Sequence, residues 1–169
     1  MIKKKLCLLG TLGVGKTSLI KKYVQNIFSQ DYLVTVGVKV DKKLVKIASG
    51  QEISLIIWDM EGQDDFTGFA DSYLRGLSGY FVVADGTRRD SFASAMDIGK
   101  SMCDMFPEAR SSLLLNKVDL IDEWKIEDSH FRDCDYFQGH CYKTSAKTGV
   151  LVDEAFVDIA TRMVESDND

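Results

Sequence analysis

The chain has 169 residues, 45% of them hydrophobic and 28% charged, with a net charge of −5 at pH 7. This length and the absence of a Pro- or Gly/Ser-rich linker predict that residues 1–169 form a single domain. The acidic balance argues against nucleic acid as a partner, because binding its backbone needs a clustered positive face. The run Lys3-Lys4-Lys5 is interpreted as a solvated strand edge.

The cysteines and the two ends of the sequence give expectations about the cellular compartment and membrane attachment. The four cysteines have neither paired disulfide spacing nor a Cys-x-x-Cys motif, and no signal-peptide pattern is present, which predicts a cytoplasmic protein. No apolar run approaches the ~18 residues of a membrane span. Residues 165–169 contain no cysteine for prenylation, so either the protein lacks a lipid anchor or the chain stops short of one. At most, we expect transient presence at a membrane surface.

In chain order, residues 5–9 read as a first buried strand, and residues 16–24 as an amphipathic helix. Valines at 36, 38 and 40 alternate with polar residues or glycine, which predicts a strand with one wet face. The turn Ser49-Gly50 leads into an apolar strand at 53–58. This pair is predicted to form a hairpin, with an antiparallel strand at the sheet edge. The apolar face of the first helix is predicted to contain Leu19, Ile20 and Tyr23.

The remaining chain alternates strands and helices. Strands are expected at residues 80–84, 113–115 and 141–143, and helices at 91–105, 127–134 and 152–164. The predicted fold is therefore α/β: a three-layer sandwich around a six-stranded, mostly parallel sheet with one antiparallel edge strand. The apolar stripe of the last helix is predicted to contain Ala155, Phe156, Ile159, Ala160 and Met163.

The first turn carries a phosphate-binding motif. Residues 10–17, here called the phosphate loop, read Gly-Thr-Leu-Gly-Val-Gly-Lys-Thr and fit G-x-x-x-x-G-K-[ST] between a strand and a helix. Glycines let successive backbone N–H groups point inward, and the helix adds its positive N-terminal end. We expect Lys16 to reach the β- and γ-phosphates and Thr17 to bind Mg²⁺.

A second motif indicates the base. Asn116-Lys117-Val118-Asp119, here called the N-K-x-D segment, begins at the carboxyl edge of a predicted buried strand, where α/β proteins bind ligands. Asp119 can accept hydrogen bonds from guanine N1–H and N2–H₂, a donor pair that adenine lacks. The methylene stem of Lys117 can lie on the base plane.

With these motifs, the chain resembles the small GTPases of the Ras superfamily, and within them the Rab-like branch, which have the P-loop GTPase fold. Residues 144–149 (Thr-Ser-Ala-Lys-Thr-Gly) and 152–156 (Val-Asp-Glu-Ala-Phe) are similar to the family's last guanine-binding loop and last helix. The likeness implies that the Ala146 N–H binds guanine O6 and that Phe28 packs on the base edge. The implied nucleotide site consists of Gly13, Val14, Gly15, Lys16, Thr17, Ser18, Phe28, Thr35, Gly62, Asn116, Lys117, Asp119, Ser145, Ala146 and Lys147.

The resemblance also implies a magnesium site, two switches and a reaction. Thr17 and Thr35 would bind Mg²⁺, with Asp59 acting through water. Gly62 would bind the γ-phosphate and Gln63 would orient the attacking water, so Gln63, Lys16 and Thr35 are the implied catalytic residues. The predicted activity is hydrolysis of GTP to GDP, slow without a GTPase-activating protein that supplies an arginine.

The same resemblance implies partners. We expect guanine nucleotides with Mg²⁺, and effector, exchange-factor and GTPase-activating proteins acting on a monomer, in vesicle traffic or signalling. Exposed apolar residues expected at the effector surface are Val34, Val36, Met60 and Phe66.

Two departures from the family pattern leave alternatives open. Leu12 is bulky where relatives carry glycine or serine, and Glu61 adds an acid beside the γ-phosphate contact. We hypothesise that both slow hydrolysis; alternatively, both side chains point away from the phosphates. A second interpretation is therefore a nucleotide-dependent scaffold with little activity. A third, a phosphate-loop kinase or ATPase, leaves the N-K-x-D segment unexplained.

One cluster of metal-ligand types is interpreted as structural. His130, Cys134, His140 and Cys141 lie close in sequence, but their spacings match no zinc pattern. His140 and Cys141 are adjacent at the start of a predicted strand, so their side chains should point to opposite faces.

Overall fold

The computed structural model describes residues 1–31, 37–60 and 71–167. Its framework is a six-stranded sheet of order β2-β3-β1-β4-β5-β6. The strands are β1 (Lys3–Leu9), β2 (Val38–Lys46), β3 (Glu52–Met60), β4 (Gly79–Asp85), β5 (Arg110–Asn116) and β6 (Cys141–Lys143). The helices are α1 (Lys16–Gln25), α2 (Asp71–Leu74), α3 (Arg89–Met105) and α4 (Val152–Glu165), with 3₁₀ helices η2 (Ile121–Glu123) and η3 (Asp128–Phe137).

The sheet has the predicted mixture of strand directions. β2 pairs antiparallel with β3 at the edge, and β3, β1, β4, β5 and β6 pair in parallel. Crossover helices make this parallel order possible, because a tight turn cannot return a chain to the same direction. The expected α/β fold with one antiparallel edge strand is confirmed.

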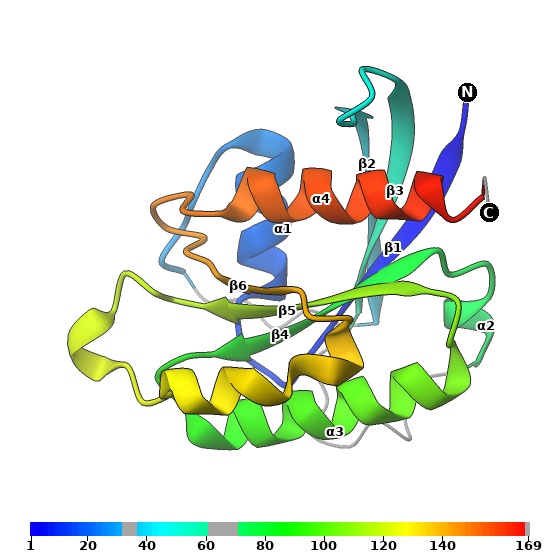
Figure 1. Cartoon of the computed structure of the whole chain (residues 1–169). Coiled ribbons are helices and arrows are strands. Elements are labelled where there is room, and N and C mark those ends of the chain that lie inside the picture. The colour runs from blue at the N-terminus through cyan, green and yellow to red at the C-terminus, as the bar shows by residue number, and fades with distance from the viewer. Residues whose placement is uncertain (32–36, 61–70, 168–169) are drawn as a thin grey trace.

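Helices cover both faces of the sheet, so that the molecule has three layers with the sheet in the middle. α1 and α4 lie on one face, and α3 and η3 lie on the other (Figure 1). Each face has its own hydrophobic cluster, and β4, at the centre, is buried along its whole length. The predicted apolar faces of α1 and α4 are confirmed, with the Tyr23 and Phe156 rings stacked 4.0 Å apart.

The helix predicted at 127–134 is instead the 3₁₀ helix η3. This segment contains three aspartates and one serine, whose side chains compete for backbone hydrogen bonds and disfavour a regular α-helix. It ends at Phe137, and the capping residue Gln138 has a left-handed φ of 56°. Its buried Phe137 lies against Gly99 of α3, so packing holds η3 on the sheet.

Three predictions about exposure are wrong. β1 is an interior strand, and Lys4 is only 7% exposed, with its ammonium 2.7 Å from Asp167. Met60 is fully buried in the cluster beneath α3, so it cannot belong to an exposed effector surface. In β2 the wet face carries Val40, which is half-exposed, whereas Val45, on the opposite face, is buried in the cluster with α1 and α4.

In the described ranges, no helix has the length and apolarity to cross a bilayer. The same residues contain no group of three or more His, Cys, Asp or Glu side chains able to hold a metal ion. His140 instead lies 3.5 Å from Asp158, and the buried Cys134 belongs to the core beneath α3.

Candidate functional site

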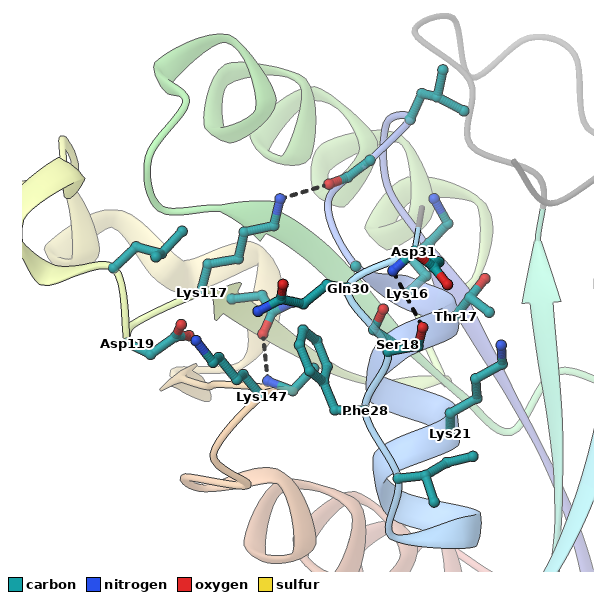
Figure 2. Close-up of a pocket in the computed structure, with 18 residues that line it drawn as sticks. Lys16, Thr17, Ser18, Lys21, Phe28, Gln30, Asp31, Lys117, Asp119 and Lys147 are labelled. Atoms are coloured by element: carbon teal, nitrogen blue, oxygen red, sulfur yellow. Dashed lines mark hydrogen bonds between the residues drawn. The ribbon is translucent and has the colours of Figure 1, made fainter. Parts of the chain in front are cut away.

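A pocket of about 330 Å³ lies where β1 and β5 end and α1 begins. Figure 2 shows Lys16, Thr17 and Ser18 at one end, and Lys117, Asp119, Lys147 and Phe28 at the other. Parallel strands end at the same edge, which is why segments distant in sequence meet here. The lining residues are Leu12, Gly13, Gly15, Lys16, Thr17, Ser18, Lys21, Ile27, Phe28, Ser29, Gln30, Asp31, Asn116, Lys117, Asp119, Leu120, Ala146 and Lys147.

The phosphate loop is held by its carbonyl groups. Side-chain donors bind five successive carbonyl oxygens: Lys16 those of residues 10 and 11, Arg88 that of 12, Lys117 that of 13 and Asn116 that of 14. Gly13 and Gly15 have φ values of 80° and 104°, a region costly for residues with a side chain. The loop geometry therefore depends on both glycine and these donors.

Lys16, near the end of the phosphate loop, is buried beneath it. Its Nζ lies 2.8 Å from the Gly10 oxygen and 3.1 Å from the Thr11 oxygen. Burial lowers the pKa of Lys16 to about 8, and the nearby Asp59 carboxylate opposes that shift. A second anion, such as a phosphate, would favour the charged ammonium further.

Thr17 and Asp59 form a pair suited to a small divalent cation. The Thr17 hydroxyl donates to Asp59 Oδ2 over 2.6 Å. Asp59 is buried, and its Oδ1 has no hydrogen-bond partner among the described residues. Burial raises the pKa of Asp59, and the Thr17 hydrogen bond and Lys16 oppose this. Oxygen ligands of this kind are what Mg²⁺ prefers, so the two residues fit the expected ion.

Asn116 joins three segments of the site. Its Nδ2 donates to the Val14 oxygen over 3.1 Å, and its Oδ1 accepts from the Thr144 hydroxyl and the Ala146 N–H. The Ala146 N–H predicted to contact guanine O6 thus already has Asn116 as an acceptor, 3.2 Å away. Val14 points into the core and does not line the pocket.

The residues predicted to contact the base gather around Asp119. Its Oδ1 accepts from the Ser145 hydroxyl over 2.7 Å, and that hydroxyl oxygen accepts the Thr148 N–H. Phe28 and Lys147 face the same end of the pocket (Figure 2). Ser145 is fully buried and acts on Asp119 from behind, not from the lining.

Sequence reasoning missed two side chains that support this site from outside the pocket lining: Asp85, the last residue of β4, and Arg88, which directly precedes α3. Asp85 Oδ2 lies 2.8 Å from Lys117 Nζ. Arg88 donates to the Leu12 oxygen over 3.1 Å and to the Thr11 hydroxyl over 3.4 Å. A usable signal existed for Asp85, because a carboxylate directly after a buried apolar strand is expected at the ligand edge.

Several predicted residues lie outside the described ranges. These are Val34, Thr35, Val36, Glu61, Gly62, Gln63 and Phe66. Their assigned roles stay predictions. Leu12 is within the described ranges: it lines the pocket and is 43% exposed.

Comparison with known proteins agrees with this fold and pocket. The model of the Ras family matches residues 5–165. Ras-related protein Rab-13 of Rattus norvegicus is 35% identical over 158 residues, which cover 92% of this chain and 77% of that protein. GTP-binding protein ypt1 of Schizosaccharomyces pombe is 31% identical over 163 residues, or 95% and 80% of the two chains. Ras-related protein Rab-8B of Dictyostelium discoideum is 30% identical over 171 residues, or 98% and 84%.

A family match over nearly the whole chain, on a sheet of this topology, shows that the chain belongs to the Ras family. Within that family it is a Rab-like small GTPase with the P-loop GTPase fold, a GTP-binding protein by class.

Proposed function

We propose that this protein binds GTP and GDP with Mg²⁺ and hydrolyses GTP as a molecular switch. One observation carries the proposal: a single pocket contains Lys16 and Thr17 at one end and Asp119 and Lys147 at the other. A purine nucleotide has the same two-ended chemistry, with anionic phosphates and a base with hydrogen-bonding edges. Asp119 would select guanine, because adenine would leave its carboxylate without donors.

The residues of the pocket have distinct proposed roles. Phosphate-loop N–H groups and Lys16 neutralise phosphate charge. Thr17, Thr35 and, through water, Asp59 would hold Mg²⁺, which would supply further positive charge to the phosphates. Gln63 orients water for in-line attack, and Thr35 and Gly62 contact the γ-phosphate. Loss of that phosphate releases both contacts, so effectors would distinguish the two states.

We further propose that hydrolysis is slow until a GTPase-activating protein binds. No arginine lines the pocket in the described ranges, and Arg88 contacts the outer backbone of the phosphate loop. The transition-state charge would then require an arginine from a partner. The likeness to Rab proteins supports regulation by exchange factors and effectors in vesicle traffic or signalling.

Calorimetric titration with GDP and ADP in Mg²⁺ tests the nucleotide class. We expect GDP binding and no measurable ADP binding. Asp119→Ala should weaken GDP binding by about 1.5–3 kcal/mol, the value of hydrogen bonds to a charged group. Equal binding of both nucleotides would overturn the guanine assignment.

The second candidate is a guanine-nucleotide-dependent scaffold with little hydrolysis, which the exposed Leu12 in the pocket wall favours. Single-turnover GTP hydrolysis by the unmodified protein separates the two functions. If Leu12 and Glu61 suppress activity, Leu12→Gly and Glu61→Ala accelerate the reaction. If neither substitution does so, that suppression is rejected.

A further inference from the structure

A buried carboxylate lies between the two ends of the pocket. Asp85 is the last residue of β4 and is only 2% exposed. Its partner in the β4–β5 register is Asn116, and the Gly86 N–H donates to the backbone carbonyl oxygen of Asn116 over 3.0 Å. The carboxylate of Asp85 therefore emerges directly beside the N-K-x-D segment.

Both carboxylate oxygens of Asp85 are engaged. Oδ1 accepts from the Thr87 N–H over 2.9 Å and from the Thr87 hydroxyl over 2.7 Å. Oδ2 lies 2.8 Å from Lys117 Nζ, and that same ammonium donates to the Gly13 oxygen over 3.0 Å. A continuous chain of contacts thus runs from β4 through Lys117 to the phosphate loop.

Asp85 is fixed, whereas Lys117 depends on its contacts. The backbone of Asp85 is held by Ser91. The Asp85 N–H donates to the Ser91 hydroxyl over 2.9 Å, and that hydroxyl donates back to the backbone carbonyl oxygen of Asp85 over 3.0 Å. Lys117 is about one-third exposed and has a φ of 72°, which is uncommon for a residue with a side chain. The side chain of Lys117 therefore needs contacts such as those to Asp85 and the Gly13 oxygen to hold its ammonium in one position.

We propose that Asp85 is a positioning residue for the nucleotide. By holding Lys117 against the Gly13 oxygen, it fixes the base-contacting lysine relative to the phosphate loop and so prolongs nucleotide residence. This inference rests on the proposed function, because it assigns Lys117 to the base.

The ionisation of Asp85 agrees with this role. Burial alone would raise the pKa of Asp85, but hydrogen bonds from Lys117 and Thr87 outweigh it and hold the pKa below its usual value. The carboxylate therefore stays charged at neutral pH, where it makes a charge-assisted hydrogen bond to the ammonium.

The primary test is the dissociation rate of a fluorescent GDP analogue from the full chain in Mg²⁺. We expect Asp85→Asn to dissociate at least about tenfold faster, consistent with loss of one charge-assisted hydrogen bond. Asp128→Asn is the matched control, because it removes an exposed carboxylate 2.7 Å from Lys143 and should leave the rate unchanged.

A double-mutant cycle separates positioning from general stability. If Asp85 acts through Lys117, Asp85→Asn adds less than about twofold to the rate of Lys117→Ala, because the contact is already lost. A purely structural role multiplies the rate by the same factor on both backgrounds, and that result would overturn the proposal. Inosine diphosphate (IDP) lacks the amino group of guanine that Asp119 is proposed to bind. The ratio of GDP affinity to IDP affinity should therefore stay unchanged in Asp85→Asn.

Folding of each variant is checked by thermal unfolding in saturating GDP. If Asp85→Asn does not fold, Asp85→Ser, which admits water beside the lysine, takes its place with the same two outcomes. Failure of the unmodified protein to bind GDP would overturn the proposed function. GDP binding with no acceleration in the Asp85 variant would overturn only the positioning role.

Discussion

At the scale of single residues, the site depends on side chains that hold backbone groups. Asn116 contacts the phosphate loop through Val14 and the last guanine-binding loop through Ala146. Its position is tight, because a Cβ on Gly15 would lie 2.3 Å from Asn116 Nδ2. The motif glycine thus serves two needs at once, a left-handed turn and room for an amide.

Gly15→Ala is therefore expected to damage both stability and binding. A left-handed alanine costs about 1–2 kcal/mol, and displacing Asn116 should weaken GDP binding by at least about tenfold. Gly139→Ala is the control, because Gly139 has a φ of 77° but nothing within 4 Å of the added Cβ. Urea unfolding and GDP titration measure the two effects. Equal GDP affinity in both variants would contradict this role of Gly15.

Asp85 also predicts a response to acid. Its folded-state pKa lies below the ordinary 3.8, so it stabilises the fold fully above that pH and loses this contribution as pH falls through the folded pKa. Asp85→Asn lacks this titration. Below pH 3.8, the unmodified protein should lose stability more steeply than the variant. Urea midpoints at several pH values measure this, and parallel curves would exclude the contribution.

At the scale of secondary-structure elements, packing decided what local preference left open. η3 has no strong helical pattern, yet Phe137 is fully buried between it and α3. A Cβ on Gly99 would lie 2.4 Å from the Phe137 ring, so the glycine in the middle of α3 makes room for this ring. The contact joins two elements about 40 residues apart, which no local pattern reveals.

Gly99→Ala should destabilise the fold by about 1–3 kcal/mol through overpacking. Helix propensity alone would stabilise by up to about 1 kcal/mol, so a net loss identifies the clash. Adding Phe137→Leu should recover part of the loss, because the smaller side chain leaves space. Chemical denaturation of the single and double variants in excess GDP measures this coupling. Additive effects would show that the two residues act independently.

At the scale of the whole molecule, the pocket links nucleotide binding to stability. Segments from α1, β5 and the loop before α4 line it, so a ligand there would tie the two ends of the chain together. On the proposed function, GDP at a hundred times its Kd adds about 2.7 kcal/mol. For a chain of this size, that raises Tm by roughly 5–10 °C.

Thermal unfolding with and without nucleotide measures this linkage. GDP with Mg²⁺ should raise Tm, whereas ADP at the same concentration should leave it unchanged. Chelating Mg²⁺ should reduce the GDP effect, because no cation would then offset the repulsion between the phosphates and the buried Asp59 carboxylate. An equal rise with ADP would contradict selection by Asp119.

The sequence alone determined the fold class, the phosphate loop, the N-K-x-D segment and the faces of α1 and α4. These features are local: spacing, periodicity and a motif between a strand and a helix encode them within a few residues. Most predicted nucleotide residues in the described ranges therefore line one pocket. Their roles, and the single-domain organisation, stay predictions.

Only the tertiary structure decided which residues support that pocket. Asp85 reaches Lys117, and Arg88 reaches Leu12, because parallel strands end at one edge and bring distant loops together. The same long-range order put Lys4 and Met60 in the interior, against their predicted exposure. Burial and partnership depend on which strands become neighbours, and spacing along the chain does not carry that information.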